Sequence, residues 1–143
     1  MKINEECVRD ILDYLVNNLH IVIIRGVKGD FNSIDLLELM KHFDGKYTQE
    51  DVWYSVYNLE QSSYIETNDV RQNSKNAFAH AYISNVTHKG HEFYESIQPQ
   101  PIWRKTKSII SKVGVHTLGF IESVAHDVAV ESAKQMINPL TVK

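Results

Sequence analysis

The sequence lacks paired cysteines and long apolar runs, and each absence excludes a class of protein. Its 143 residues include a single cysteine, Cys7, so no disulfide can form within the chain, and such a chain is typical of reducing compartments. No segment approaches the ~18 apolar residues that cross a bilayer. The first residues carry Glu5 and Glu6 where a signal peptide would be apolar. We therefore expect a cytoplasmic protein that makes no membrane contact.

The sequence also lacks an excess of positive charge. Its formal net charge is -3, so no bulk attraction to nucleic acid or to an anionic membrane is expected. The charge is unevenly spread: residues 1–66 hold 6 Lys and Arg against 12 Asp and Glu, whereas residues 67–143 hold 9 against 6. This asymmetry predicts two surfaces of opposite sign.

Known catalytic signatures are absent as well. The chain has no phosphate-binding Walker loop, no nucleophile elbow, no HExxH zinc motif and no dinucleotide fingerprint. His88 and His91 are spaced to share a metal, but no further ligand pattern accompanies them. We expect no catalytic residue, metal or cofactor, and an enzyme with an unrecognised site is the remotest alternative.

The periodicity of the apolar residues predicts a fold of class α+β that is mostly helical. A helix is expected over 4–19, capped by Asn4, with Cys7 packed beside its apolar stripe. A β-branched run over 20–25 predicts a buried strand, and a turn follows over 26–32.

The next segments predict the order of a winged helix-turn-helix domain. A helix capped by Ser33 is expected to Phe43, with Ile34, Leu37 and Met40 inward and Leu36 as a further candidate. A second helix is expected over 48–62. Two strands over 64–86 then form a short hairpin, the wing, which the strand over 20–25 joins as a third strand. Helices over 87–98, 102–113 and 117–137 complete the chain. We expect a winged-helix domain over 1–98 and a helical extension over 99–143, which packs on that domain or forms a dimer contact.

The most distinctive stretch runs from the wing into the helices that follow. It reads Tyr82-Ile83-Ser84, then Thr87-His88-Lys89-Gly90-His91-Glu92-Phe93, then Ile102-Trp103-Arg104-Lys105-Thr106-Lys107. This pattern resembles a family of small bacterial and phage proteins known as domain of unknown function 2513. The resemblance implies a winged helix and a phage or prophage origin, and it supplies no catalytic or binding residues.

Two binding hypotheses follow, and the sequence leaves both open. The first is a module that binds itself or another protein. Small and apolar residues of the last expected helix would form the self-association face: Leu118, Ile121, Ala125, Val128, Ala129 and Ser132. The aromatic residues Trp53, Tyr54 and Tyr57 cannot all be interior, and exposed aromatic residues are common at protein interfaces.

The second hypothesis is a transcriptional regulator that binds duplex DNA. In most winged helices the third helix lies in the major groove, but here that helix has three acids and no Lys or Arg. Its Asn58 and Gln61 could read adenine edges. Phosphate contacts would come from the wing and from a basic segment that lacks acids: Arg71, Lys75, Arg104, Lys105, Lys107 and Lys112.

Overall fold

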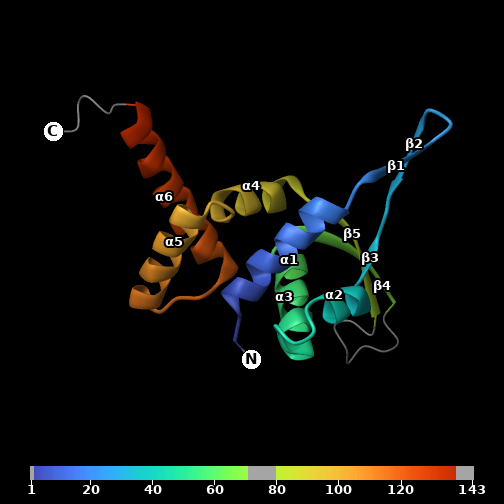
Figure 1. Ribbon diagram of the computed structural model, residues 1–143, viewed down its shortest axis with the longest axis horizontal. Coiled ribbons are helices and arrows are strands. Elements are labelled where there is room, and N and C mark those ends of the chain that lie inside the picture. Colours follow the sequence, from blue (N-terminus) through green and yellow to red (C-terminus); the bar gives the residue numbers. More distant parts are fainter. Residues whose placement is uncertain (1, 71–79, 138–143) are drawn as a thin grey trace. The chain divides into compact units, whose positions relative to one another are not determined.

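A computed structural model describes residues 2–70 and 80–137 of the chain (Figure 1). These residues form six helices: α1 (Glu5–Asn18), α2 (Leu36–His42), α3 (Gln49–Gln61), α4 (His88–Ile97), α5 (Gln100–Val113) and α6 (Leu118–Ile137). They also form five strands: β1 (Ile21–Ile24), β2 (Val27–Phe31), β3 (Ile34–Asp35), β4 (Ile65–Val70) and β5 (His80–Val86). The fold is therefore α+β and mostly helical, as the sequence predicts. It divides into two compact units, residues 1–91 and residues 92–143.

The first unit is organised around α1 and α3, which pack against each other. The side chain of Asn4 accepts a hydrogen bond of 3.1 Å from the Cys7 amide, and this caps α1 as predicted. Thr48 caps α3 in the same way by accepting from the Asp51 amide at 3.0 Å. The apolar stripes of both helices are fully buried, and they form the centre of the core: Cys7, Val8, Ile11, Leu12 and Leu15 of α1, with Val52, Val56 and Leu59 of α3.

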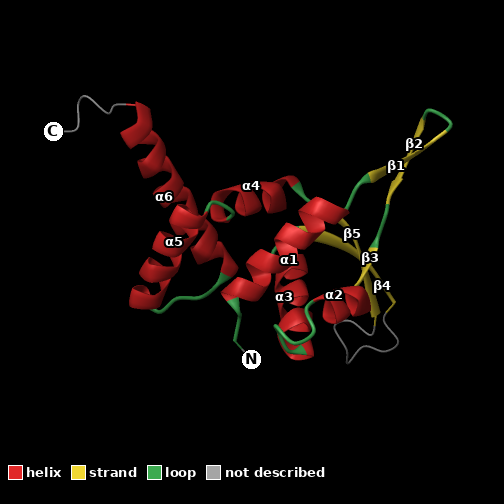
Figure 2. Cartoon of the chain, viewed as in Figure 1, coloured by secondary structure: helices red, strands yellow, loops and turns green. Residues whose placement is uncertain are grey.

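A three-stranded antiparallel sheet closes the first unit, with the strand order β3-β5-β4 (Figure 2). The expected hairpin is present, since β4 pairs with β5 from Ile65↔Val86 to Val70↔His80. Ala81 and Ile83 are buried while Tyr82 between them is exposed, so one face of β5 joins the core.

The prediction that the strand over 20–25 joins this sheet is wrong. β1 pairs instead with β2, which occupies most of the expected turn, and the two form a separate ribbon (Figure 2). The third strand of the sheet is β3, whose Ile34 and Asp35 pair with Ile83 and Tyr82. The cause is a tight turn after β1, which returns the chain on itself before it reaches the sheet.

The prediction that this strand is buried is also wrong. Ile21, Val22 and Ile23 are all exposed, Ile23 at 65% of its surface. A β-branched run favours extended backbone in either environment, so its composition alone does not establish burial.

The second helix begins two residues later than predicted. Asp35, not Ser33, is the N-cap of α2, and its side chain accepts from the Leu37 amide at 3.0 Å. This shift turns the helix so that Leu36 and Leu39 are buried. The predicted inward residue Leu37 is 54% exposed, whereas Ile34 is buried in β3.

The second unit contains most of α4 and the pair α5 and α6, which contact each other. Pro101 lies in the first turn of α5, where its missing amide hydrogen costs no helical bond. The sequence predicts a helix starting at Ile102, and α5 starts two residues earlier for this reason. α5 ends at Val113, as predicted, and Gly114 follows it in the left-handed conformation at φ 85°. Among the described residues, no helix has the length and apolar character to cross a membrane.

Candidate interaction surfaces

The surface of α3 is acidic at its start and carries no basic residue. Glu50 and Asp51 lie in its first turn and Glu60 in its last. Glu50 and Asp51, which lie at the N-terminal end, are stabilised by the helix dipole. Their carboxylates also repel a phosphate that would approach the same end of the helix. The local electrostatics therefore disfavour docking of α3 on a nucleic-acid backbone.

The same helix displays three stacked aromatic rings. The rings of Trp53 and Tyr57 lie 5.2 Å apart and nearly parallel, and those of Tyr54 and Tyr57 lie 6.3 Å apart. All three side chains are half-buried, so each presents part of its ring to solvent. The expectation that these aromatic residues are not all interior is confirmed. Stacking holds the rings in place, which gives α3 a rigid, partly apolar outer face.

The residues proposed to read or contact DNA are not brought together by α3. Asn58 is half-buried and donates to the Tyr54 carbonyl at 2.8 Å, and Gln61 is exposed and donates to Glu60 at 2.9 Å. Arg71 and Lys75 lie outside the described residues. Both described side chains are thus engaged within their own helix.

Four basic residues lie along α5, and they are the ones predicted for this segment. Arg104, Lys105 and Lys112 are exposed, while Lys107 is half-buried with its ammonium 5.8 Å from the centre of the Trp103 ring. Ser108 and Ser111 separate these cations, and the helix contains no acid. Among the described residues, Arg104, Lys105 and Lys112 form no ion pair. We call these four cations the α5 basic segment.

The residues proposed for self-association are largely used inside the chain. Leu118, Ile121, Ala125 and Val128 are buried, and Ala129 and Ser132 are half-buried. Because α5 and α6 contact each other, this stripe already has an internal partner. Self-association stays a prediction, but a partner would need other residues.

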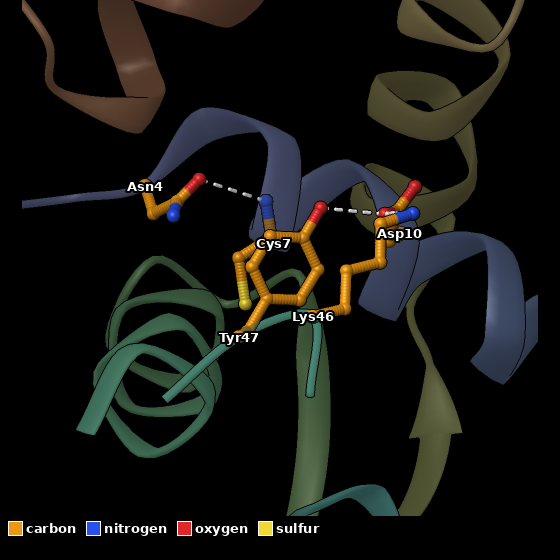
Figure 3. Close-up of polar contacts among 5 residues, drawn as sticks. All are labelled: Asn4, Cys7, Asp10, Lys46 and Tyr47. Carbon is orange, nitrogen blue, oxygen red and sulfur yellow. Dashed lines mark hydrogen bonds and ion pairs between the residues drawn. The ribbon is translucent and has the colours of Figure 1, made fainter. Parts of the chain in front are cut away.

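A cluster of polar contacts joins α1 to the segment before α3 (Figure 3). The Tyr47 hydroxyl donates to Asp10 Oδ2 at 2.6 Å, and Lys46 Nζ lies 2.9 Å from the same oxygen. Burial, with the neighbouring Asp10 carboxylate as hydrogen-bond partner, raises the pKa of Tyr47. Tyr47 is therefore a neutral donor at physiological pH, and the cluster anchors the chain between α2 and α3. The sequence does not reveal this pair, because the two residues are 37 positions apart.

Cys7 is fully buried in the same region, in agreement with the prediction that it is a packing residue. Burial raises the pKa of its thiol to about 11. A buried neutral thiol is a poor nucleophile, because the thiolate is the reactive form.

The distinctive Thr87–Gly90 segment forms a tight joint at the start of α4. The Thr87 hydroxyl accepts from the Gly90 amide at 3.0 Å and donates to the Ser63 carbonyl at 2.7 Å. A side chain at Gly90 would collide with the Tyr64 carbonyl. Thr87 and Gly90 thus allow the start of α4 to pack closely against the backbone that leads into β4.

No metal centre is formed by the part of the chain that the structure describes. No group of three or more His, Cys, Asp or Glu residues has metal-binding geometry within residues 2–70 and 80–137. The second unit has one open pocket of about 330 Å³ between α4 and α6, lined in part by Glu92, Glu122 and His126. Its walls are mostly exposed, so it offers little burial to a ligand.

These features define a class: the described residues form an α+β protein with six helices and a small three-stranded antiparallel sheet. The model of one protein family, described as hypothetical protein (DUF2513), matches residues 2–116. Because this match covers most of the chain, the protein belongs to the DUF2513 family, as the motif after the wing predicts. No curated protein and no solved structure matched the chain.

Proposed function

We propose that this chain is a non-catalytic winged-helix module that acts through protein contacts, self-association included. The order β3, α2, α3, β4, β5 and the sheet order β3-β5-β4 support the winged-helix class. The proposal depends on α3, the helix that most winged helices place in the major groove. Its acids and its stacked aromatic rings suit a protein surface better than a phosphate backbone.

The proposal also covers the setting in which the module works. A phage or prophage origin follows only from the family resemblance. A cytoplasmic location is proposed from the single cysteine, which is typical of a reducing compartment. A protein partner there would meet α3 as a fixed, partly apolar face with acids at both ends.

The mass of the protein in solution tests self-association. Light scattering at tens of micromolar should give the mass of at least two chains, decreasing on dilution. Titration with mixed-sequence duplex DNA should show no binding that depends on α3, so that Asn58→Ala and Gln61→Ala leave any DNA affinity unchanged. A monomer at these concentrations would refute self-association, and a DNA affinity lost on changing α3 would refute the proposal.

A second candidate function, binding of duplex DNA, is favoured by the α5 basic segment alone. Four cations without an intervening acid can displace counterions from DNA, so the affinity would fall steeply with salt. If so, Arg104→Ala and Lys105→Ala should each weaken binding uniformly across sequences and lower the salt slope by about 1. Lys41→Ala, an exposed cation of α2, is the matched control. If Lys41→Ala weakened DNA binding as much as these two variants, the binding would depend on the overall charge of the protein and not on α5.

A further inference from the structure

The ribbon formed by β1 and β2 is an arm of the first unit with no cover (Figure 1). Each strand has the other as its principal contact, and together they form a two-stranded sheet with both outer edges open among the described residues. Ile21, Val22 and Ile23 are exposed along it. An isolated two-stranded ribbon is marginally stable in water, and an apolar open edge favours pairing with another strand.

The tip of the arm holds an arginine in a conformation that arginine rarely adopts. Ile24 pairs with Val27, so the turn consists of Arg25 and Gly26 alone. Both have positive φ, 53° and 75°, as a type I′ turn requires. Asn, Asp or Gly would adopt this conformation at lower cost. The sequence thus places an exposed guanidinium at the apex at some expense in backbone energy.

An acidic and aromatic groove of about 270 Å³ lies near the base of the arm. Its lining is Asp10, Asp13, Tyr14, Asn17, Asn18, His42, Phe43 and Lys46. Lys46 pairs with Asp10 at 2.9 Å, so Asp13 supplies the negative charge that this ion pair does not balance. The rings of Tyr14 and His42 are 4.3 Å apart, and the last turn of α1 beside them contains no basic residue. Carboxylates, an aromatic face and the negative end of a helix dipole are the features that bind a guanidinium.

The base of the arm is fixed beside this groove. Asn32 donates to the Asn18 carbonyl at 3.1 Å, and its own side-chain oxygen accepts from the His20 amide at 2.6 Å. Four or five extended residues then carry the tip about 15 Å away from the base. The turn between β1 and β2 therefore lies at the far end of the arm, away from α1 (Figure 1).

We propose that the arm docks on a second copy of this chain, with Arg25 of each copy in the Asp13 groove of the other. The two β1 edges pair antiparallel about a two-fold axis, which places the tip of one arm beside the base of its partner. One arrangement thus covers the exposed Ile21, Val22 and Ile23 and satisfies the charge of both tips. This inference rests on the proposed function, because it names the surface that self-association would use.

The test is the dimer dissociation constant by sedimentation equilibrium for a set of arm and groove variants. Arg25→Asn should weaken the dimer at least tenfold, although Asn suits the turn and should leave the arm folded. Arg25→Asp and Asp13→Arg should each weaken it similarly, and the double variant should restore the affinity to within about threefold. Lys41→Asn removes an exposed cation outside both arm and groove and should have no effect.

Each outcome separates this inference from the proposed function. A dimer whose affinity all arm and groove variants leave unchanged would overturn the inference and leave self-association standing through another surface. A double variant that stays as weak as the singles would overturn the assigned contact between Arg25 and Asp13. A monomeric unchanged protein would overturn both. Duplex DNA binding that Arg25→Asn abolishes would assign the arm to DNA instead.

Discussion

The Tyr47 hydroxyl donates a hydrogen bond of 2.6 Å to Asp10, and so joins the segment before α3 to the middle of α1. Lys46 reaches the same carboxylate at 2.9 Å, but its side chain is 64% exposed. An exposed ion pair contributes little because water and salt screen it. The hydrogen bond of the neutral phenol is therefore the contact that holds these two segments together.

Removal of this hydroxyl should lower the stability of the protein. Tyr47→Phe leaves the ring in place and removes only the hydroxyl. It should reduce the free energy of unfolding by about 1.5 kcal/mol, because a hydrogen bond to a partly exposed charged acceptor contributes about that much. Urea denaturation followed by circular dichroism measures this change. Lys46→Met serves as the control and should cost clearly less. If Tyr47→Phe and Lys46→Met reduced the free energy of unfolding equally, the hydrogen bond would not be the stronger of the two contacts.

The buried thiol of Cys7 should make stability depend on pH in the alkaline range. Burial raises its pKa to about 11 in the folded chain, from 9.0 for a thiol in water. At a pH between these two pKa values, the thiol is protonated in the folded chain and loses its proton when the chain unfolds. The contribution of this group is thus fully present below pH 9 and is lost as the pH rises towards 11. The stability advantage of the unchanged protein over Cys7→Ala should therefore shrink from pH 9 to pH 11, and a constant difference would contradict this.

Two glycines at helix starts should respond oppositely to alanine. At Gly90 a Cβ would meet the Tyr64 carbonyl and lie 2.8 Å from Val86, so Gly90→Ala should cost about 1–3 kcal/mol through overpacking. At Gly119 a Cβ meets nothing within 4 Å. Gly119→Ala should therefore be neutral or raise stability by up to about 1 kcal/mol. Thermal unfolding of both variants measures the contrast. A neutral Gly90→Ala would show that α4 can move away from β4 at no cost.

Thr106 offers a substitution that should stabilise the second unit. Its side chain is fully buried in α5, and its hydroxyl has no hydrogen-bond partner among the described residues. Thr106→Val preserves the shape and removes a polar group that burial has stripped of water. It should raise the free energy of unfolding by about 1 kcal/mol. A fall of similar size on chemical denaturation would mean that the hydroxyl is bonded in solution.

Local signals in the sequence were sufficient for most of the helices. Caps such as Asn4, Thr48 and Gly114 act over a few residues, so their chemistry is visible in the chain order and marks helix ends correctly. The stripes of α1 and α3 follow the helical period and identify the core for the same reason.

Strand partners could not be derived in this way. β3 has only Ile34 and Asp35, too few residues for an alternation to appear, and the longer apolar run at Ile21–Ile24 was the more obvious choice as third strand. One signal was available: Arg25-Gly26 separates two short extended runs, as in a two-residue hairpin.

The sequence predicts the basic residues of α5 but not the polar contacts and the groove of the first unit. The basic residues of α5 lie close together in the sequence and can be recognised there, and the structure places them on one helix. Contacts such as Asp10 with Tyr47, and the groove beside Asp13, depend on how α1 and the segment before α3 meet. Distant pairs of this kind arise from packing, which no local pattern encodes.

Asn4 has two hydrogen bonds whose combination links both main helices of the first unit. Its oxygen caps α1 at the Cys7 amide, and its nitrogen donates to the Asp51 carboxylate in the first turn of α3 at 3.3 Å. Fraying of either helix start thus removes support from the other. We therefore expect opening of the first turn of α1 to weaken the first turn of α3, even though 47 positions separate Asn4 from Asp51 in the chain.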